Sequence, residues 1–215
     1  MTFPAGTGRG TLMTGEGGND TLTNNNTAGG NFSGGAGNDT ITAGSGSDTL
    51  FGDAGNDTLN GGLGVNSILG GPGDDTLTGG LSNDTVSGDD GDDTYRASIV
   101  LDGRDFFFGG TGSDTADYQA RNNAGRNTLL TLTLNGTGDD GEPNEGDTFA
   151  ADVENVKGGT GRNFITGNTL DNTLEGNVQP DIILAQDGIG GNDVIDSHPF
   201  GGDVCTADPG DSVIC

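Results

Sequence analysis

This chain of 215 residues has few of the residues that build a thick globular core. It has no Trp, only two Tyr, and just 29% hydrophobic residues in total. No apolar run approaches the roughly 18 residues that a membrane-spanning helix needs, so we expect no membrane span. Low hydrophobicity combined with high net charge is typical of disordered chains.

Basic residues are also scarce. Lys and Arg number 7 against 33 Asp and Glu, which gives a formal charge of −26. Without a basic patch to neutralise phosphates, a nucleic-acid partner is not expected. A charge of this size opposes compaction and attracts cations. Something outside the chain is therefore expected to complete its fold.

Residues with reactive side chains are few. The single His198 has no nucleophile motif of the G-x-S-x-G type, no P-loop and no H-E-x-x-H beside it, so we expect no enzyme. The two cysteines, Cys205 and Cys215, lie ten residues apart near the C-terminus without a CxxC pattern. We expect them to form a disulfide in an oxidising compartment, with free thiols as the alternative.

Glycine, in contrast, is abundant at 45 residues, and it recurs with a period of nine. Seven blocks run without a gap from Gly34 to Arg96, beginning with GGAGNDTIT, AGSGSDTLF and GDAGNDTLN. The frame gives eleven blocks between Gly15 and Asp117, and five more between Gly158 and Thr206. We number the nine positions of each block as slots one to nine. Gly at slots one, two and four permits a turn, and slots seven to nine alternate polar, apolar and polar residues like a short strand.

Two blocks would make one coil of a flattened solenoid, because a turn and a strand cannot close a core alone. We therefore predict an all-β fold: a parallel β-roll with two opposed sheets and no significant helix. Slot eight would form one thin apolar seam, made by Leu22, Phe32, Ile41, Leu50, Leu59, Ile68, Leu77, Val86 and Tyr95.

Acids at slot six would stack in columns, since residues eighteen apart lie above one another in such a solenoid. Asp20, Asp39, Asp57, Asp75 and Asp93 form one column, with about 5 Å between neighbouring coils. Stacked carboxylates repel at that distance unless a cation lies between them. Carboxylates and exposed backbone carbonyls are hard oxygen ligands, which suit Ca²⁺ better than Zn²⁺ or Cu²⁺.

The blocks resemble the GGxGxDxUx nonapeptide of RTX (hemolysin-type) calcium-binding proteins, over roughly two thirds of the chain. The resemblance implies several Ca²⁺ ions between coils, held by carbonyls of slots one to four and by slot-six carboxylates. For two successive sites it implies Gly35, Gly37, Asp39, Gly52, Ala54 and Asp57, then Asp53, Gly55, Asp57, Gly70, Pro72 and Asp75. The other metal ligands implied are Asp20, Gly44, Gly46, Asp48, Gly61, Asn66, Gly71, Gly73, Asp84, Gly88, Asp90, Asp93, Asp105, Asp114, Asp181, Asp193 and Asp203.

The two edges of the solenoid are not expected to be equal. The first column has Asp at every slot six, whereas the opposite edge reads Gly30, Asp48, Asn66 and Asp84 before Asp105. We hypothesise that the all-Asp edge binds Ca²⁺ more tightly. In the C-terminal blocks Asn163 and Asn172 replace Asp, so calcium occupancy there is less expected than at Asp181, Asp193 and Asp203.

The repeat divides the chain into five segments. We predict a lead-in at 1–14, a first β-roll at 15–117, a non-repeat β segment at 118–157, a second β-roll at 158–206 and a tail at 207–215. Within the non-repeat segment, residues 128–135 and 152–159 are predicted as strands, and 136–147 as an acidic loop that is either solvated or an extra cation site. Outward-facing Phe51, Leu69, Phe106 and Phe108 imply a covering segment, which we expect to be 118–157 or another chain.

Together these features predict a non-catalytic calcium-binding β-roll that is secreted, or held at the cell surface, and folds on binding Ca²⁺ outside the cell. Two alternatives remain open. The chain could be a self-assembling or adhesive surface protein, with itself or a cell-surface molecule as partner. It could also be the repeat region of a larger secreted enzyme or toxin.

Overall fold

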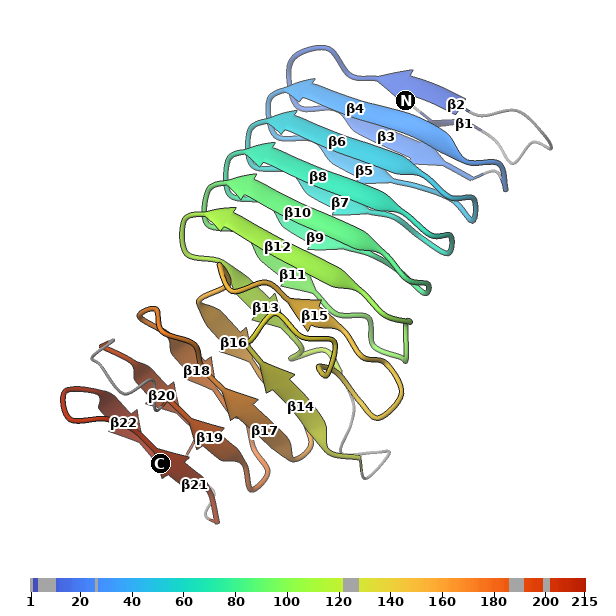
Figure 1. The fold of residues 1–215 in the computed structure, drawn as a ribbon. Coiled ribbons are helices and arrows are strands. Elements are labelled where there is room, and N and C mark those ends of the chain that lie inside the picture. Colours follow the sequence, from blue (N-terminus) through green and yellow to red (C-terminus); the bar gives the residue numbers. More distant parts are fainter. Residues whose placement is uncertain (1, 4–10, 26, 122–127, 186–191, 199–201) are drawn as a thin grey trace.

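Short parallel strands stack into a long solenoid in the computed structural model (Figure 1). It describes residues 2–3, 11–25, 27–121, 128–185, 192–198 and 202–215. Within these ranges it has strands β1 to β22 and no helix, which confirms the predicted all-β parallel solenoid. It follows that no described helix could cross a membrane.

One long sheet runs through the whole molecule and holds every second strand of the repeat. It has 11 strands in parallel order. They are β1 (Thr2–Phe3), β3 (Thr21–Asn24), β5 (Thr40–Thr42), β7 (Thr58–Asn60), β9 (Thr76–Thr78), β11 (Thr94–Arg96), β13 (Thr115–Asp117), β16 (Asn155–Lys157), β18 (Thr173–Glu175), β20 (Val194–Asp196) and β22 (Ser212–Ile214).

Two shorter sheets contain the intervening strands. The N-terminal sheet contains β2 (Thr11–Thr14), β4 (Gly30–Ala36), β6 (Thr49–Ala54), β8 (Ser67–Pro72), β10 (Thr85–Asp90), β12 (Phe106–Thr111) and β15 (Thr148–Phe149). The C-terminal sheet contains β14 (Leu130–Thr133), β17 (Asn163–Thr166), β19 (Ile182–Leu184) and β21 (Val204–Thr206). The chain alternates between the long sheet and a short one, so two nonapeptides make one coil.

The register of the strands follows the repeat. Thr58 pairs with Thr40 on one side and with Thr76 on the other, in each case eighteen residues away. This register places slot eight of every block inside. All nine residues predicted for the apolar seam are buried, with exposed fractions of 0–1%. The predicted thin seam is confirmed.

Strands of the N-terminal sheet are longer than the three residues predicted for each block. The strands β6 and β8 continue through slot three of the next block, so that Asp53 and Ala54 pair with Gly35 and Ala36. Slot two there has a positive φ, 72° at Asp53 and 105° at Gly35. The backbone therefore stays paired between coils until the glycine at slot four reverses the chain.

The segment between β13 and β16 is an excursion from a single coil. Thr115 pairs directly with Asn155, although about forty residues separate them. The excursion contributes β14 to the C-terminal sheet and β15 to the N-terminal sheet, so the two short sheets meet at this level (Figure 1). The strands predicted within 128–135 and 152–159 are confirmed as β14 and β16.

The excursion does not cover the outward aromatic residues. Phe51, Phe106 and Phe108 keep exposed fractions of 38%, 38% and 45%. The expectation that segment 118–157 shields them is wrong for its described residues, because the excursion continues the coil stack instead of folding back over the sheet. The division of the chain into five segments stays a prediction. Parts of the predicted lead-in and blocks lie outside the described residues, namely residues 1, 4–10, 26, 186–191 and 199–201.

Candidate metal sites

Slot-six carboxylates line both edges of the N-terminal half and form hydrogen-bonded columns. On the all-Asp edge, which leads into the long sheet, each backbone N–H donates to the carboxylate of the following coil. Asp39 N lies 2.6 Å from Asp57 Oδ1, and Asp57 N lies 2.7 Å from Asp75 Oδ1. Asp75, Asp93 and Asp114 continue the pattern with distances of 2.8 and 2.9 Å. One oxygen of each carboxylate is thereby fixed to the backbone.

The second oxygen of these carboxylates has no hydrogen-bond donor among the described residues. It is buried in nine cases, namely Asp20, Asp39, Asp48, Asp57, Asp75, Asp84, Asp93, Asp114 and Asp181. Every one of these is a slot-six residue of the repeat. A buried charged oxygen without a partner is costly, so native proteins supply a donor, a metal ion or a proton.

Burial raises the pKa of these carboxyl groups, and like charges in neighbouring coils add to the effect. The pKa of Asp57 rises to about 6 and that of Asp75 to about 7, although backbone hydrogen bonds lower both. The pKa of Asp114 rises to about 7 for the same reasons. The columns therefore hold their negative charge poorly unless a cation compensates it.

Slot-one glycines keep a space open beside eight of the nine unpaired oxygens, all except that of Asp48. A Cβ atom added at Gly52 would lie 2.5 Å from the carbonyl oxygen of Gly70 and would also contact Asp57 Oδ2. At Gly70 it would meet Gly88 O at 2.8 Å and, closer still, Asp75 Oδ2. A carbonyl of one coil and a carboxylate of its neighbour thus converge on the same point. This all-oxygen surrounding fits Ca²⁺.

The other predicted carbonyl ligands also point between coils. The carbonyl oxygens of Asp53 and Gly55, at slots two and four, lie where a Cβ atom added at Gly71 or Gly73 of the next coil would be. The slot-three carbonyl of Pro72 instead accepts a hydrogen bond from Gly55 N at 2.9 Å. A carbonyl oxygen has two lone pairs, so Pro72 O could accept this hydrogen bond and still bind a metal ion. Its role as a calcium ligand stays a prediction.

The opposite edge is built differently at Asn66 and Ala43. Asn66 Oδ1 accepts from Asp48 N at 2.9 Å, as an Asp would, but Asn66 Nδ2 donates to Gly64 O at 2.7 Å. The amide thus occupies carbonyl lone pairs that a metal ion would use. One coil earlier on the same edge, Ala43 stands at slot one, where most other blocks leave room with glycine. Both features disfavour a cation beside Asp48.

Amides also replace carboxylates in the C-terminal half. Asn163 Nδ2 donates to Gly161 O at 3.0 Å and to Asp181 Oδ1 at 2.9 Å. Asn172 Nδ2 donates to Asn168 Oδ1 at 2.9 Å. Among the predicted ligands of this half, Asp181 retains a buried oxygen without a donor. It is the C-terminal carboxylate that most resembles those of the all-Asp edge.

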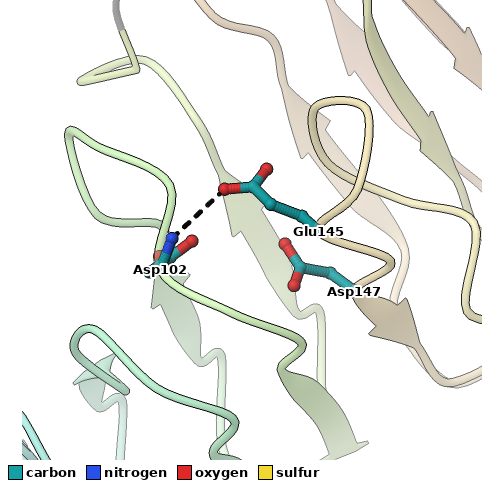
Figure 2. Close-up of side chains that lie close together, drawn as sticks. All are labelled: Asp102, Glu145 and Asp147. Carbon is teal, nitrogen blue, oxygen red and sulfur yellow. Dashed lines mark hydrogen bonds between the residues drawn. The ribbon is translucent and has the colours of Figure 1, made fainter.

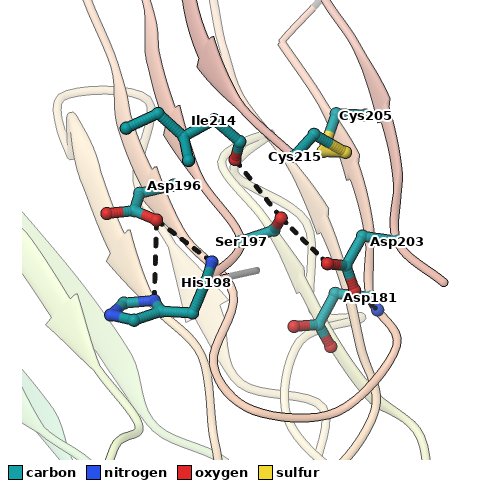
Figure 3. The surroundings of a disulfide bond; sticks show 8 residues. All are labelled: Asp181, Asp196, Ser197, His198, Asp203, Cys205, Ile214 and Cys215. Atoms are coloured by element: carbon teal, nitrogen blue, oxygen red, sulfur yellow. Dashed lines mark hydrogen bonds and ion pairs between the residues drawn. A yellow bond between two sulfur atoms is a disulfide. The ribbon is translucent and has the colours of Figure 1, made fainter. Parts of the chain in front are cut away.

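The last coils are closed by protein groups. Figure 3 shows Ser197 Oγ donating to Asp203 Oδ2 at 3.0 Å, while Asp181 N donates to Asp203 Oδ1 at 2.9 Å. Beside them Cys205 and Cys215 form a disulfide with a Cα–Cα distance of 6.2 Å. Cys205 lies in β21 at the seam position, so the bond joins the end of the seam to the C-terminal residue.

Three acids outside the predicted set extend the columns. Asp114 N donates to Glu154 Oε2 at 2.8 Å, Asp105 N to Asp147 Oδ1 at 2.9 Å, and Asp193 N to Asp211 Oδ1 at 3.2 Å. Glu154 and Asp147 lie in the non-repeat segment, which is why the nonapeptide frame does not reveal them. The sequence does contain one pattern that could have revealed them, namely an acid directly before a short strand. It occurs in Glu154-Asn155-Val156-Lys157 and in Asp147-Thr148-Phe149.

The acidic loop of the excursion points inward. Asp140, Glu142, Glu145 and Asp147 are all buried, with exposed fractions of 0–5%, whereas Asp139 is exposed. Asp140 Oδ1 accepts from Thr133 N, and Glu145 Oε2 from Glu142 N at 2.6 Å. The interpretation of this loop as solvated is therefore wrong, because backbone N–H groups and buried side chains hold its acids inside.

Comparison with protein families supports the same interpretation of the repeat. The model of the RTX calcium-binding nonapeptide repeat matches in four copies, at residues 33–68, 60–95, 101–117 and 151–183. These ranges cover a little more than half of the chain and include most of the carboxylate columns. A search of curated proteins found no match. By its repeats and by the roll that they form, the chain belongs to the RTX calcium-binding nonapeptide repeat family.

Proposed function

We propose that this chain is a non-catalytic module that folds into its roll on binding several Ca²⁺ ions outside the cell. The observation that carries the proposal is the set of nine buried slot-six oxygens without a donor among the described residues. Divalent cations between coils would satisfy these oxygens, except beside Asp48, where Asn66 and Ala43 disfavour a cation, and would reduce the formal charge of −26. Because the ligands converge only in the folded roll, the free energy of metal binding becomes free energy of folding.

An extracellular setting is supported by two properties of the chain. Extracellular calcium modules work at about 10⁻⁴–10⁻³ M, where modest sites fill. The Cys205–Cys215 disulfide suits an oxidising environment. The direct test of the proposal is a calcium titration of the chelator-treated protein, followed by the far-UV circular dichroism signal of its strands.

A structural role, not a catalytic one, is supported by the acidic pairs. In Asp74-Asp75, the second carboxylate belongs to the column, while the first accepts from Asp92 N at 3.1 Å in an exposed ladder one residue away. Both acids are therefore used in joining one coil to the next. His198 is exposed, and its nearest ionic partner is Asp196 at 3.6 Å.

We expect Asp57→Ala to weaken calcium binding far more than Asp48→Ala. Asp57 lies between Asp39 and Asp75, so it serves a site on each side, whereas Asp48 has Asn66 as its neighbour. Isothermal titration calorimetry should show a loss of about tenfold or more in affinity for Asp57→Ala, or about 1.4 kcal/mol, and less than about twofold for Asp48→Ala. Equal losses in the two variants would contradict the inequality of the edges.

Acid is expected to replace calcium in part. Burial raises the pKa of Asp75 to about 7 and that of Asp93 to about 6, from an ordinary value of 3.8. A raised carboxyl pKa means that the calcium-free roll binds protons more tightly than the unfolded chain, so its stability is present at low pH and is lost as pH rises toward 7. In chelator, the strand signal should therefore increase from neutral pH to about pH 5.

With calcium present, the same protons should compete with the metal. The calcium concentration at the midpoint of folding should then rise as the pH falls over this range. Circular dichroism measures both effects: the strand signal in chelator at each pH, and the calcium midpoint of folding at each pH. A strand signal in chelator that falls on acidification would contradict the assignment of these carboxylates.

A further inference from the structure

The level at which the two short sheets meet differs chemically from the coils on its N-terminal side. We refer to it as the junction and define it by Tyr95, Asp102, Asp105, Phe107, Tyr118, Arg121, Glu145, Asp147 and Phe149, all of which are buried. They come from the coils of β11–β13 and from the excursion around β15. Side chains that are distant in sequence thus pack together here.

In the junction, protein groups donate hydrogen bonds to the carboxylates of Asp105 and Asp147. Tyr95 OH donates to Asp105 Oδ2 at 2.6 Å, and Tyr118 OH donates to Asp147 Oδ2 at 2.5 Å. The other oxygens of the two carboxylates accept from Asp84 N and Asp105 N. The two acids belong to a carboxylate column, yet neither has an unpaired oxygen like those of the preceding coils.

Arg121 supplies positive charge at the same place. Its side chain is fully buried, with Nη2 2.9 Å from Asp102 Oδ1 and Nη1 in contact with Glu145 Oε1. Its guanidinium also lies over the Tyr118 ring, 5.4 Å from the centroid. Burial opposes its charge, but the carboxylates of Asp102 and Glu145 raise the pKa of Arg121 further, so it stays protonated.

Asp102 and Glu145, which pair with Arg121, lie close enough to Asp147 to suggest a metal site. Asp102, Glu145 and Asp147 offer oxygens within 4.8 Å of one another, and Figure 2 shows Asp102 on one loop near Glu145 and Asp147, which share another. Their remaining oxygens are occupied, however. Asp102 Oδ2 accepts from Ser98 N at 2.9 Å and Glu145 Oε2 from Glu142 N at 2.6 Å. The guanidinium therefore takes the place that a cation would fill.

The apolar seam is also thicker at the junction. The Tyr95 ring lies 5.6 Å from Phe107 and 6.2 Å from Phe149, and Tyr118 meets Phe149 edge-on at 5.8 Å. In the coils from β3 to β10 the seam has single aliphatic residues and Phe32. The excursion adds buried Leu130, Leu132 and Leu134. Aromatic pairs contribute beyond the area that they bury.

We infer that the junction is a metal-independent core of the roll: Arg121 and the two tyrosines provide internally what the preceding coils must take from Ca²⁺. The inference rests on the proposed calcium-dependent folding. When calcium is removed, the junction should stay folded while the coils from β3 to β10 unfold. When calcium returns, those coils should fold onto a template that is already present.

The chain provides its own probes for this test. Tyr95 and Tyr118 are its only tyrosines, and it has no tryptophan. The tyrosine band in near-UV circular dichroism, and the quenching of tyrosine fluorescence by acrylamide, therefore report on the junction alone. Far-UV circular dichroism reports on all the strands.

In excess chelator we expect the tyrosine band and the weak quenching to persist while most of the strand signal is lost. Loss of both signals at the same free calcium would overturn the inference. This is also the result expected if a divalent ion, and not Arg121, holds Asp102, Glu145 and Asp147 together. A strand signal unaffected by chelator would instead refute the calcium-dependent folding of the coils, and the tyrosine signal would still report on the junction.

Two variants sharpen the test. Arg121→Gln keeps a polar side chain but removes the buried charge, so the tyrosine band should become dependent on calcium. Arg96→Gln is the matched control, because Arg96 is 59% exposed and lies 4.0 Å from Asp117. A tyrosine band of Arg121→Gln that persists in chelator, as in the control, would exclude Arg121 as the internal cation.

Hydrogen exchange gives an independent measurement of the unmodified chain, in case Arg121→Gln does not fold at all. In chelator, amides of β12, β13 and β16 should remain protected, while those of β5, β7 and β9 exchange rapidly. Equal exchange in the two groups would overturn the inference whatever the variant does.

Discussion

Removal of calcium with excess EGTA is expected to abolish most of the far-UV β-strand signal. Nine buried carboxylate oxygens lack a protein donor among the described residues, and each unsatisfied buried group costs about 1–3 kcal/mol. Their combined cost is comparable with the whole stability of an ordinary domain, about 5–15 kcal/mol. Burial of one seam residue in each block contributes about 1.5–3 kcal/mol, which must also offset the conformational entropy of ordering the nine residues of that block. The coils should therefore open when the cation leaves.

The titration needs two controls. Calcium added back in excess over the chelator should restore the signal, which shows that unfolding was reversible. Magnesium at the same free concentration should restore little, because it is smaller, demands octahedral geometry and gives up its water reluctantly. A strand signal that is unchanged in chelator would refute the proposed function.

The fold was predictable because the repeat specifies register directly. A period of nine with one apolar slot forces Leu59 to stack on Leu77, and the pairing of β7 with β9 follows from it. The same register places Asp57 beside Asp75, so the carboxylate columns follow from the sequence alone. Local sequence is sufficient wherever each coil contacts only its neighbours.

Prediction from the sequence was weakest where residues distant in the chain pair with each other. The acids after β14 resemble a solvated loop because nothing near them in sequence neutralises Glu145, whereas its partner Arg121 lies twenty-four residues earlier. Glu154 was missed for a related reason, since it joins the column of Asp114 across the whole excursion. The strand extension through Asp53 depends on pairing between coils, which slot chemistry alone does not reveal.

The second large effect concerns glycine at slot one, where we expect Gly70→Ala to disable a calcium site. The φ of Gly70 is not in the left-handed region, so alanine would not strain the backbone. Its methyl group would instead occupy the point where Asp75 Oδ2 and Gly88 O converge. Isothermal titration should show one fewer ion, or a loss of affinity of about tenfold at that site, about 1.4 kcal/mol.

The matched control for this change is Gly17→Ala. Gly17 also belongs to a turn of the all-Asp edge, but at slot three, where an added Cβ would find its nearest atom, Ala36 O, 3.8 Å away. Its calcium titration should match that of the unmodified protein. Ala43 already places a methyl group at slot one beside Asp48, so the natural sequence contains the substitution on the edge where we expect weak binding. Equal behaviour of Gly70→Ala and Gly17→Ala would mean that the space beside Asp75 is not where the cation binds.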